Sequence, residues 1–305
     1  MDFKNFDRIR LYTHGRVQTS IGHQIGHLDD FVCMALAARF GWAQIRIEDV
    51  NPDSVRARLG RDSYVLNLLC DFLYAPEVWE SNVLVFDHHD PQNPTDRCSA
   101  HQLMEELVRQ GLMREIPSLM EQISAWDVVG PQAIPVNDRP EPDKYTAILA
   151  AEPSEGFDPK TASFILAMLE RSFSIRQFIN ELFSSETSFG ETARTIYADI
   201  QAKREEVLAD IVDNAVLKIS SSGVRYASLE QNPAGMLKEV FSRLEADIVI
   251  HPNERTVGAL SIVRDSNGKY ATTPVAELVE VAQDQLVFQH PGGFLLVAYP
   301  PVVIK

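Results

Sequence analysis

The chain has 305 residues, 45% of them hydrophobic and 23% charged, and its formal net charge is −15 at pH 7. This length allows two domains of ordinary size, and no apolar run approaches the roughly 18 residues that span a bilayer. The charge disfavours long duplex nucleic acid, which is held largely by Lys and Arg on its phosphates, but bound divalent cations would let the chain take a short phosphorylated ligand.

The three cysteines, Cys33, Cys70 and Cys98, form an odd set without the spacing of a zinc site. In their apolar or helical surroundings they are typical of reduced thiols. The N-terminus lacks the basic-then-apolar order of a secretory signal. We therefore expect a cytoplasmic protein with no membrane partner.

The N-terminal segment combines a strand, a glycine-containing turn and a helix. Residues 8–13 alternate polar and apolar side chains, as an early or edge strand does. The turn that follows holds His23 and His27. Residues 28–41 show helical spacing of apolar positions, with two acidic residues in the first turn, where the helix dipole favours them. One of these acids, Asp29, is either a capping residue or a metal ligand together with the two histidines.

Further strands are predicted at 43–48, 63–70 and 83–86, with a helix at 51–60. The strand at 63–70 is nearly continuous in its apolar character, which is typical of a central strand buried on both faces. Alternating strands and helices predict an α/β fold with a mostly parallel sheet. In such sheets, ligands bind just beyond the carboxyl ends of the strands.

The strand at 83–86 leads directly into Asp87, His88, His89 and Asp90. Two carboxylates and two imidazoles at the carboxyl end of a buried strand suit a site for a hard metal ion. A polar turn after a core strand is the alternative interpretation, because short motifs match by chance.

The middle of the chain is predicted to be helical. We expect helices at 98–108, with Ser99 as N-cap, and at 117–126, leading to Asp127. Prolines predict a loop at 130–143, after which helices dominate to about residue 214.

Strand patterns return after that point, at 216–219, 224–229, 247–250, 259–263 and 294–298, with one helix at about 232–244. The sequence therefore predicts a metal-binding catalytic domain at 1–150, a helical connector at 151–189 and a smaller C-terminal α/β domain at 190–305 that binds substrate.

Acidic and imidazole side chains gather at predicted strand ends and helix starts. They are His23, His27 and Asp29; Asp71; Asp87, His88 and His89; and Asp127. Mixed His and Asp ligands without cysteine favour Mn²⁺ or a similar ion, with Mg²⁺ as the alternative. Two such ions about 3.5 to 4 Å apart are the usual device for hydrolysing a phosphate ester.

The triplet Asp87-His88-His89 resembles the signature of the DHH phosphoesterase superfamily. Before it, His27-Leu28-Asp29-Asp30 looks like the first motif of that family, and Asp71 is similar to the second. After it, Cys98-Ser99-Ala100 resembles the small-residue helix start that follows the triplet, and Ala125-Trp126-Asp127 looks like the fourth motif.

The C-terminal part extends the resemblance. Residues 286–294 resemble a glycine-containing substrate segment, and a strand pair at 247–265 precedes them. Both look most like the Myg-type (melanocyte proliferating gene) branch, whose members are metal-dependent exonucleases acting on RNA from the 3′ end.

The resemblance implies a DHH-like N-terminal domain that binds two Mn²⁺ or Mg²⁺ ions. The implied metal ligands are His23, His27, Asp29, Asp71, Asp87, His88 and Asp127. Asp71 would bridge the ions and His89 would face the scissile phosphate, so the implied catalytic residues are Asp87, His88 and His89. His14 competes with His23 for the first ligand position, and Asn67 competes with Asp71 for the second motif.

The implied substrate-binding residues are His89, Arg264, His290, Gly292 and Gly293. The glycine pair would let the backbone approach substrate, although a plain turn explains it as well. Arg264 would contact a phosphate, with an ordinary surface residue as the alternative.

Together these expectations favour a metal-dependent phosphodiesterase that acts on short nucleic acid, as a 3′–5′ exonuclease on RNA, by a two-metal mechanism. One alternative is a phosphatase acting on a small nucleotide. Another is a catalytically weakened member that binds a nucleotide or a partner chain. The sequence leaves the oligomeric state open, and a homodimer is compatible with it.

Overall fold

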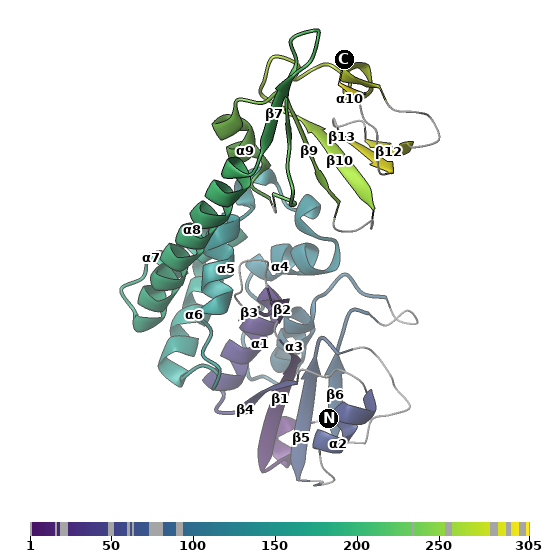
Figure 1. Ribbon diagram of the computed structural model, residues 1–305. Helices are drawn as coiled ribbons and strands as arrows, with labels where there is room; N and C mark the ends of the chain where they lie inside the picture. The colour runs from purple at the N-terminus through teal and green to yellow at the C-terminus, as the bar shows by residue number, and fades with distance from the viewer. Residues whose placement is uncertain are drawn as a thin grey trace. The chain divides into compact units, whose positions relative to one another are not determined.

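The chain forms two compact units, Met1–Gln201 and Ala202–Lys305 (Figure 1). The computed structural model describes residues 2–15, 17–18, 24–47, 52–59, 62, 64–72, 82–89, 94–233, 235–253, 258–280, 286–290, 294–298 and 303–304. The division into parts at 1–150, 151–189 and 190–305 stays a prediction. Each unit is described here by itself.

The first unit contains a four-stranded sheet in the order β4-β1-β5-β6. Its strands are β1 (Arg8–His14), β4 (Ala43–Ile47), β5 (Val65–Cys70) and β6 (Val83–Phe86). All three pairings are parallel, which confirms the predicted α/β fold with a parallel sheet. Every residue of β5 is buried, as expected for the continuous apolar run.

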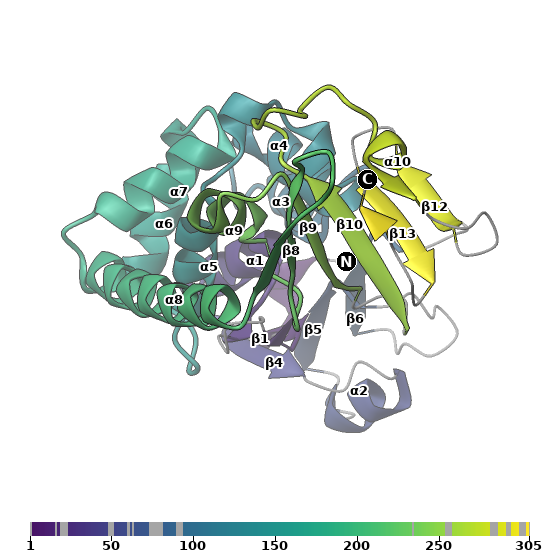
Figure 2. The ribbon, with the colours of Figure 1, turned by 45° about the horizontal axis from the view of Figure 1, so that its top comes forward.

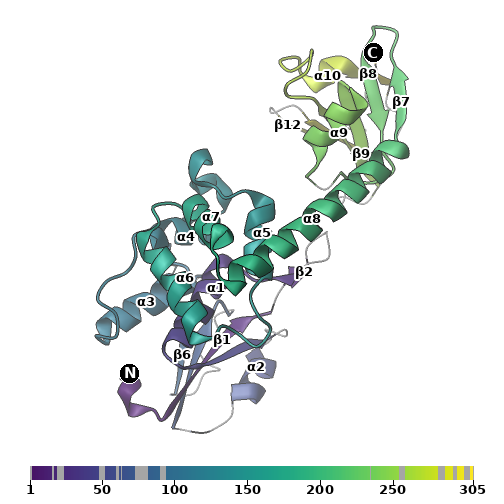
Figure 3. The ribbon, with the colours of Figure 1, turned by 90° about the vertical axis from the view of Figure 1, so that its left-hand side faces the viewer.

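Helices cover both faces of this sheet (Figure 3). One face shares a core with α1 (Leu28–Arg39), α3 (Ser99–Arg109), α4 (Leu119–Val128), α6 (Pro159–Arg171) and α7 (Ile175–Ser184). The opposite face packs against Val55 and Leu59 of α2 (Pro52–Leu59). The first unit also holds α5 (Pro142–Ala150), η1 (Phe3–Asn5) and a hairpin of β2 (Val17–Gln18) with β3 (Gln24–Ile25), while α8 (Ser188–Asp213) includes the boundary between the units.

Three local predictions are wrong. Asp127 lies inside α4 rather than after it. The N-cap of α3 is Cys98, and Ser99 is the first helical residue. The predicted loop at 130–143 contains two 3-10 turns, η3 (Pro131–Ala133) and η4 (Val136–Asp138), and the start of α5, because proline is tolerated in the first turn of a helix.

The second unit contains a six-stranded mixed sheet in the order β12-β13-β10-β9-β8-β7 (Figure 2). The strands are β7 (Val216–Ile219), β8 (Arg225–Ser228), β9 (Ile248–Pro252), β10 (Ala259–Arg264), β12 (Leu286–His290) and β13 (Phe294–Ala298). One face packs on α9 (Leu237–Leu244), and the other on α10 (Val275–Leu278) and the β11 (Val279–Glu280) and β14 (Val303–Ile304) pair. Among the described helices, none combines the length and apolarity needed to cross a bilayer.

Candidate metal centre

Parallel strand ends bring the candidate ligands to one edge of the first unit's sheet. His14 is the last residue of β1, Asp71 follows β5, and Asp87 follows β6. The first turn of α1, which holds Asp29 and Asp30, begins directly after His27. The carboxyl edge of a parallel sheet is where α/β proteins place their ligands, so this clustering follows from the topology.

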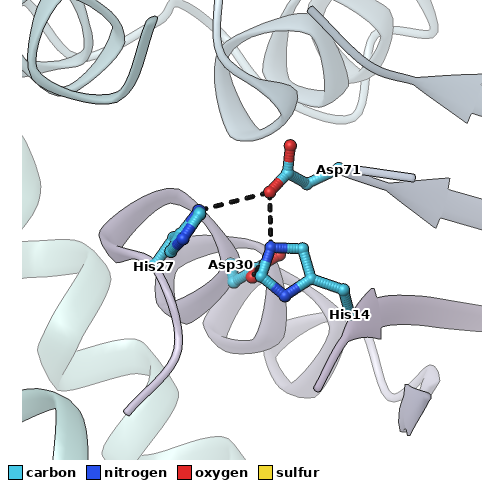
Figure 4. Close-up of side chains that lie close together, drawn as sticks. All are labelled: His14, His27, Asp30 and Asp71. Carbon is cyan, nitrogen blue, oxygen red and sulfur yellow. Dashed lines mark ion pairs between the residues drawn. The ribbon is translucent and has the colours of Figure 1, made fainter. Parts of the chain in front are cut away.

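The first group of ligand atoms consists of His14, His27, Asp30 and Asp71 (Figure 4). Nε2 of His14 lies 2.6 Å from Oδ2 of Asp71 and 3.5 Å from Oδ2 of Asp30. Nδ1 of His27 lies 3.3 Å from the same Asp71 oxygen. Nδ1 of His14 lies 2.9 Å from the carbonyl oxygen of Gly15, a contact that fixes the ring and leaves Nε2 for the group.

A second group consists of Asp71, Asp87, His88 and His89. Oδ1 of Asp71 lies 3.6 Å from Nδ1 of His88 and 3.5 Å from Nδ1 of His89. Oδ1 of Asp87 lies 2.7 Å from Nδ1 of His89 and also accepts the backbone N–H of His89 at 3.0 Å. Asp87 therefore holds His89 in one orientation and keeps its other oxygen, Oδ2, for the centre.

His27, Asp29 and Asp127 form a third group, which contacts the other two. Oδ1 of Asp127 lies 3.6 Å from Nδ1 of His27, and its Oδ2 lies 3.5 Å from Nδ1 of His88. The three groups thus form one continuous centre built from β1, β5, β6, α1 and α4.

Asp71 occupies the middle of this centre in an unusual backbone conformation. Its φ of 59° lies in the left-handed region, which non-glycine residues rarely adopt. Its side chain is 1% exposed and contacts histidines from β1, the start of α1 and the turn after β6. Strained backbone of this kind is concentrated at functional sites.

The donor atoms fit a hard divalent cation. Several buried polar atoms of the centre have no hydrogen-bond partner among the described residues: both carboxylate oxygens of Asp29 and of Asp30, Oδ2 of Asp87, Oδ2 of Asp127 and Nδ1 of His88. Buried carboxylates without partners are costly, and a bound cation would satisfy them. Oxygen and imidazole nitrogen donors without thiolates suit Mn²⁺ or Mg²⁺.

Burial and mutual repulsion set the charge of the acids. Burial, with Asp71 nearby, raises the pKa of Asp29 to about 6. Burial and Asp29 raise the pKa of Asp127 to about 8 and that of Asp30 well above its usual range. Burial also acts to raise the pKa of Asp71, but contacts with His14 and His27 outweigh it and hold that pKa below its usual range.

The histidines respond to the same surroundings. Burial acts to lower the pKa of His14, but the Asp71 carboxylate outweighs burial and raises it. Burial lowers the pKa of His88, and the neighbouring His89 lowers it further. A neutral His88 is the form that binds a metal ion.

The structure brings together seven residues singled out by the sequence: His27, Asp29, Asp71, Asp87, His88, His89 and Asp127. It adds His14, which entered only as a competitor of His23, and Asp30, which was not a candidate. The signals for these two were the strand end at His14 and the second acid in the first turn of α1. His23 lies outside the described residues.

Two alternatives are resolved by the geometry. Asn67 lies within β5, opposite Arg10 of β1 and Val83 of β6, and is absent from all three groups of described residues. Asp29 is not a capping residue, because the N-cap of α1 is His27 and neither carboxylate oxygen of Asp29 accepts a hydrogen bond from the described residues.

The candidate substrate residues of the second unit are only partly described. Arg264 is the last residue of β10, and its Nε and Nη1 atoms are buried without a hydrogen-bond partner among the described residues. His290 is the last residue of β12, but its side chain lies outside the described part of the structure, as do Gly292 and Gly293.

No family model and no curated protein matches this chain. Solved structures with some likeness include the pGpG-specific phosphodiesterase PggH from Vibrio cholerae, at 13% identity and a TM-score of 0.37, with 95% of this chain and 93% of that chain covered. The DHH domain of a member of a family of ribosomal proteins gives 14% identity and a TM-score of 0.32, with 95% and 83% covered. RecJ from Thermus thermophilus, in complex with Mn²⁺, gives 14% and 0.29, with 95% and 49% covered. Likeness at this level assigns this chain neither to a family nor to a function.

Proposed function

We propose that this chain is a metal-dependent phosphoesterase of the DHH type that hydrolyses phosphodiester bonds in short nucleic acid with two divalent ions, Mn²⁺ or Mg²⁺. The observation that carries the proposal is the set of three overlapping groups of nitrogen and oxygen ligands at the carboxyl edge of the parallel sheet. The resemblance of Asp87-His88-His89 to the DHH signature agrees with this chemistry.

Asp71 supports a centre for two ions rather than one. Its Oδ2 faces His14 and His27, whereas its Oδ1 faces His88 and His89. A carboxylate whose two oxygens face different ligand groups is suited to bridge two cations. Paired ions are the usual means of stabilising both the attacking and the leaving oxygen of a phosphate ester.

Each ligand of the chain has a distinct role in this proposal. His14, His27, Asp29, Asp30, Asp71, Asp87, His88 and Asp127 would hold the ions, with His23 as a further predicted ligand. Two bound ions would withdraw charge from the phosphate oxygens and activate water. Every other contribution comes from the protein, which fixes the ligands and limits water around the buried carboxylates.

His89 is the residue placed to meet the substrate. Its side chain is 43% exposed, whereas that of Asp87 is 1% exposed. Asp87 accepts from the Nδ1 side of the ring, which stabilises the charged imidazolium and leaves Nε2 to donate to a phosphate oxygen.

The finer assignment is a 3′–5′ exonuclease on RNA. The net charge of −15 favours short substrates, because long nucleic acid needs many basic contacts. The partnerless buried nitrogens of Arg264 make it a candidate phosphate contact, since an unpaired buried guanidinium is costly. His290, Gly292 and Gly293 complete the proposed substrate segment on the basis of the family resemblance.

A single assay separates this function from its rivals. The purified chain is incubated with Mn²⁺ and either a short 5′-labelled RNA or a chromogenic phosphodiester, and its metal content is measured. Stepwise shortening from the 3′ end supports the exonuclease, and release of phosphate only from small nucleotides supports a phosphatase. No turnover and no bound metal refutes the proposal and favours a binding protein.

Loss of activity in Asp87→Ala and His88→Ala, with unchanged folding by circular dichroism, ties turnover to this centre. Activity that survives both substitutions would come from elsewhere and would count against the proposed site.

A further inference from the structure

A buried ion pair lies directly behind the candidate metal centre. Arg46, on β4, donates from Nε and Nη2 to Oε1 of Glu152 at 3.0 and 2.7 Å, and Nη2 lies 2.5 Å from Oε2. Their side chains are 11% and 1% exposed. Burying two charges costs desolvation energy that the pairing often fails to recover, so such a pair adds little stability by itself.

The same guanidinium reaches the backbone of His14. Nη1 of Arg46 donates to the carbonyl oxygen of His14 at 3.0 Å. His14 is the last residue of β1, and its Nε2 lies 2.6 Å from Asp71. Arg46 therefore fixes the strand end from which this imidazole enters the centre.

The guanidinium also packs against the residue before His27. A Cβ atom on Gly26 would lie 3.0 Å from Nη1 and 3.2 Å from Nη2 of Arg46. Only glycine leaves room for this contact without displacing the guanidinium. The rings of His14 and His27 meet edge to face with their centroids 4.7 Å apart, so both segments that Arg46 touches present histidines to one point.

We propose that Arg46, with Glu152 as its buried counter-ion, is a positioning residue that sets the distance between His14 and His27 in the metal centre. The planar fork of arginine makes this possible, because it pairs with a carboxylate through two nitrogens and still donates through a third. The inference rests on the proposed function, since it concerns the ligands of the same centre.

The test removes both charges together. Arg46→Met alone would leave Glu152 buried without a counter-ion and could unfold the chain, whereas replacing both partners by apolar residues is often neutral or stabilising. In Arg46→Met/Glu152→Met we expect Mn²⁺ affinity, measured by calorimetry or by the electron spin resonance of free Mn²⁺, to fall about 10- to 100-fold. Urea unfolding of the metal-free protein should remain cooperative.

Arg46→Lys is the second variant, and it keeps the positive charge beside Glu152. A single ammonium group cannot pair with the carboxylate as a fork and hold the His14 carbonyl as well. We expect weaker Mn²⁺ binding here too. If the double variant does not fold, this variant decides the question.

Gln44 supplies the matched control, because it lies on the same strand and links the same part of the chain. Its side chain donates to the carbonyl oxygen of Phe157 at 2.8 Å and accepts from the N–H of Phe157 at 2.7 Å. These hydrogen bonds hold Phe157 rather than either histidine-bearing segment. Gln44→Met should therefore lower stability and leave Mn²⁺ affinity unchanged.

Each outcome separates the two proposals. If the wild type binds Mn²⁺ and the folded Arg46 variants bind it equally well, the positioning role is refuted and the proposed function stands. If Gln44→Met loses as much affinity as the Arg46 variants, the effect is general damage and the role is also refuted. If the wild type binds no Mn²⁺, the proposed function fails and this inference fails with it.

Discussion

Asp71→Asn is the most direct perturbation of the candidate metal centre. Asparagine has nearly the same shape and tolerates the left-handed conformation that Asp71 adopts at a φ of 59°, so the backbone needs no change. The substitution removes one negative charge from the side chain that belongs to two of the three ligand groups.

The expected loss can be worked from the distances. The ligand nitrogens that surround Asp71 lie 2.6 to 3.6 Å from its oxygens, so an ion among them would lie within a few ångströms of the carboxylate. Two unit charges about 4 Å apart attract by about 4 kcal/mol at an effective dielectric constant near 20. If half of that survives compensation, about 2 kcal/mol remains, and the divalent charge doubles it. We therefore expect Mn²⁺ affinity to fall by at least about 100-fold.

Calorimetric titration of the metal-free protein with Mn²⁺ measures this loss. Asp158→Asn is the matched control, because Asp158 caps α6 by accepting from Lys160 and Thr161, and asparagine caps as well as aspartate does. NMR titration of the imidazoles adds a readout that needs no metal. Asp71 raises the pKa of His14, so the variant should titrate that histidine at lower pH. Unchanged Mn²⁺ affinity together with an unchanged pKa of His14 would refute the arrangement described here.

Three further predictions test the pH dependence and the local structure. The raised pKa values of Asp29 and Asp127, about 6 and about 8, mean that the folded chain keeps protons the unfolded chain has lost, so the free energy of unfolding in EDTA should fall as the pH rises from about 4 to about 8, and a rise in urea titrations across that window would contradict this. Ser174→Ala removes the oxygen that accepts from the N–H of Gln177 at the start of α7 and should cost about 1 kcal/mol in urea unfolding, whereas the mid-helix change Ser163→Ala should not. Gly156→Ala should lower the melting temperature more than Gly41→Ala, because both glycines have positive φ but only at Gly156 would the Cβ meet a neighbour, Gln44 Oε1 at 2.5 Å; equal losses would leave backbone strain as the whole effect.

Local patterns were sufficient for the sheet of the first unit. The apolar run of β5 predicted a central buried strand, and the alternation of strands with helices predicted parallel pairing, which the register confirms. Parallel pairing then placed Asp71 and Asp87 at the same edge without further information. These features depend on residues close in sequence, and for that reason they could be predicted.

Features that depend on distant residues could not be predicted in the same way. Asp30 has the sequence context of an exposed acid in a first helical turn, but helix packing buries it fully. Arg46 and Glu152 are separated by 106 positions, and no periodicity links them. The end of α4 was placed too early, because Asp127 was interpreted as a strand-end type of ligand although it projects from the helix itself.

The metal-free centre opposes folding, and this cost is itself an argument for a ligand. Asp29 and Asp30 are completely buried, and Asp71 is in a strained backbone conformation beside them. Natural chains keep such destabilising arrangements where function requires them. A cation that binds only the folded chain stabilises it by mass action, and the gain should grow as the acids lose their protons. The rise in melting temperature caused by Mn²⁺ should therefore be larger at about pH 8 than at about pH 5.5, and it should be largely lost in Asp71→Asn.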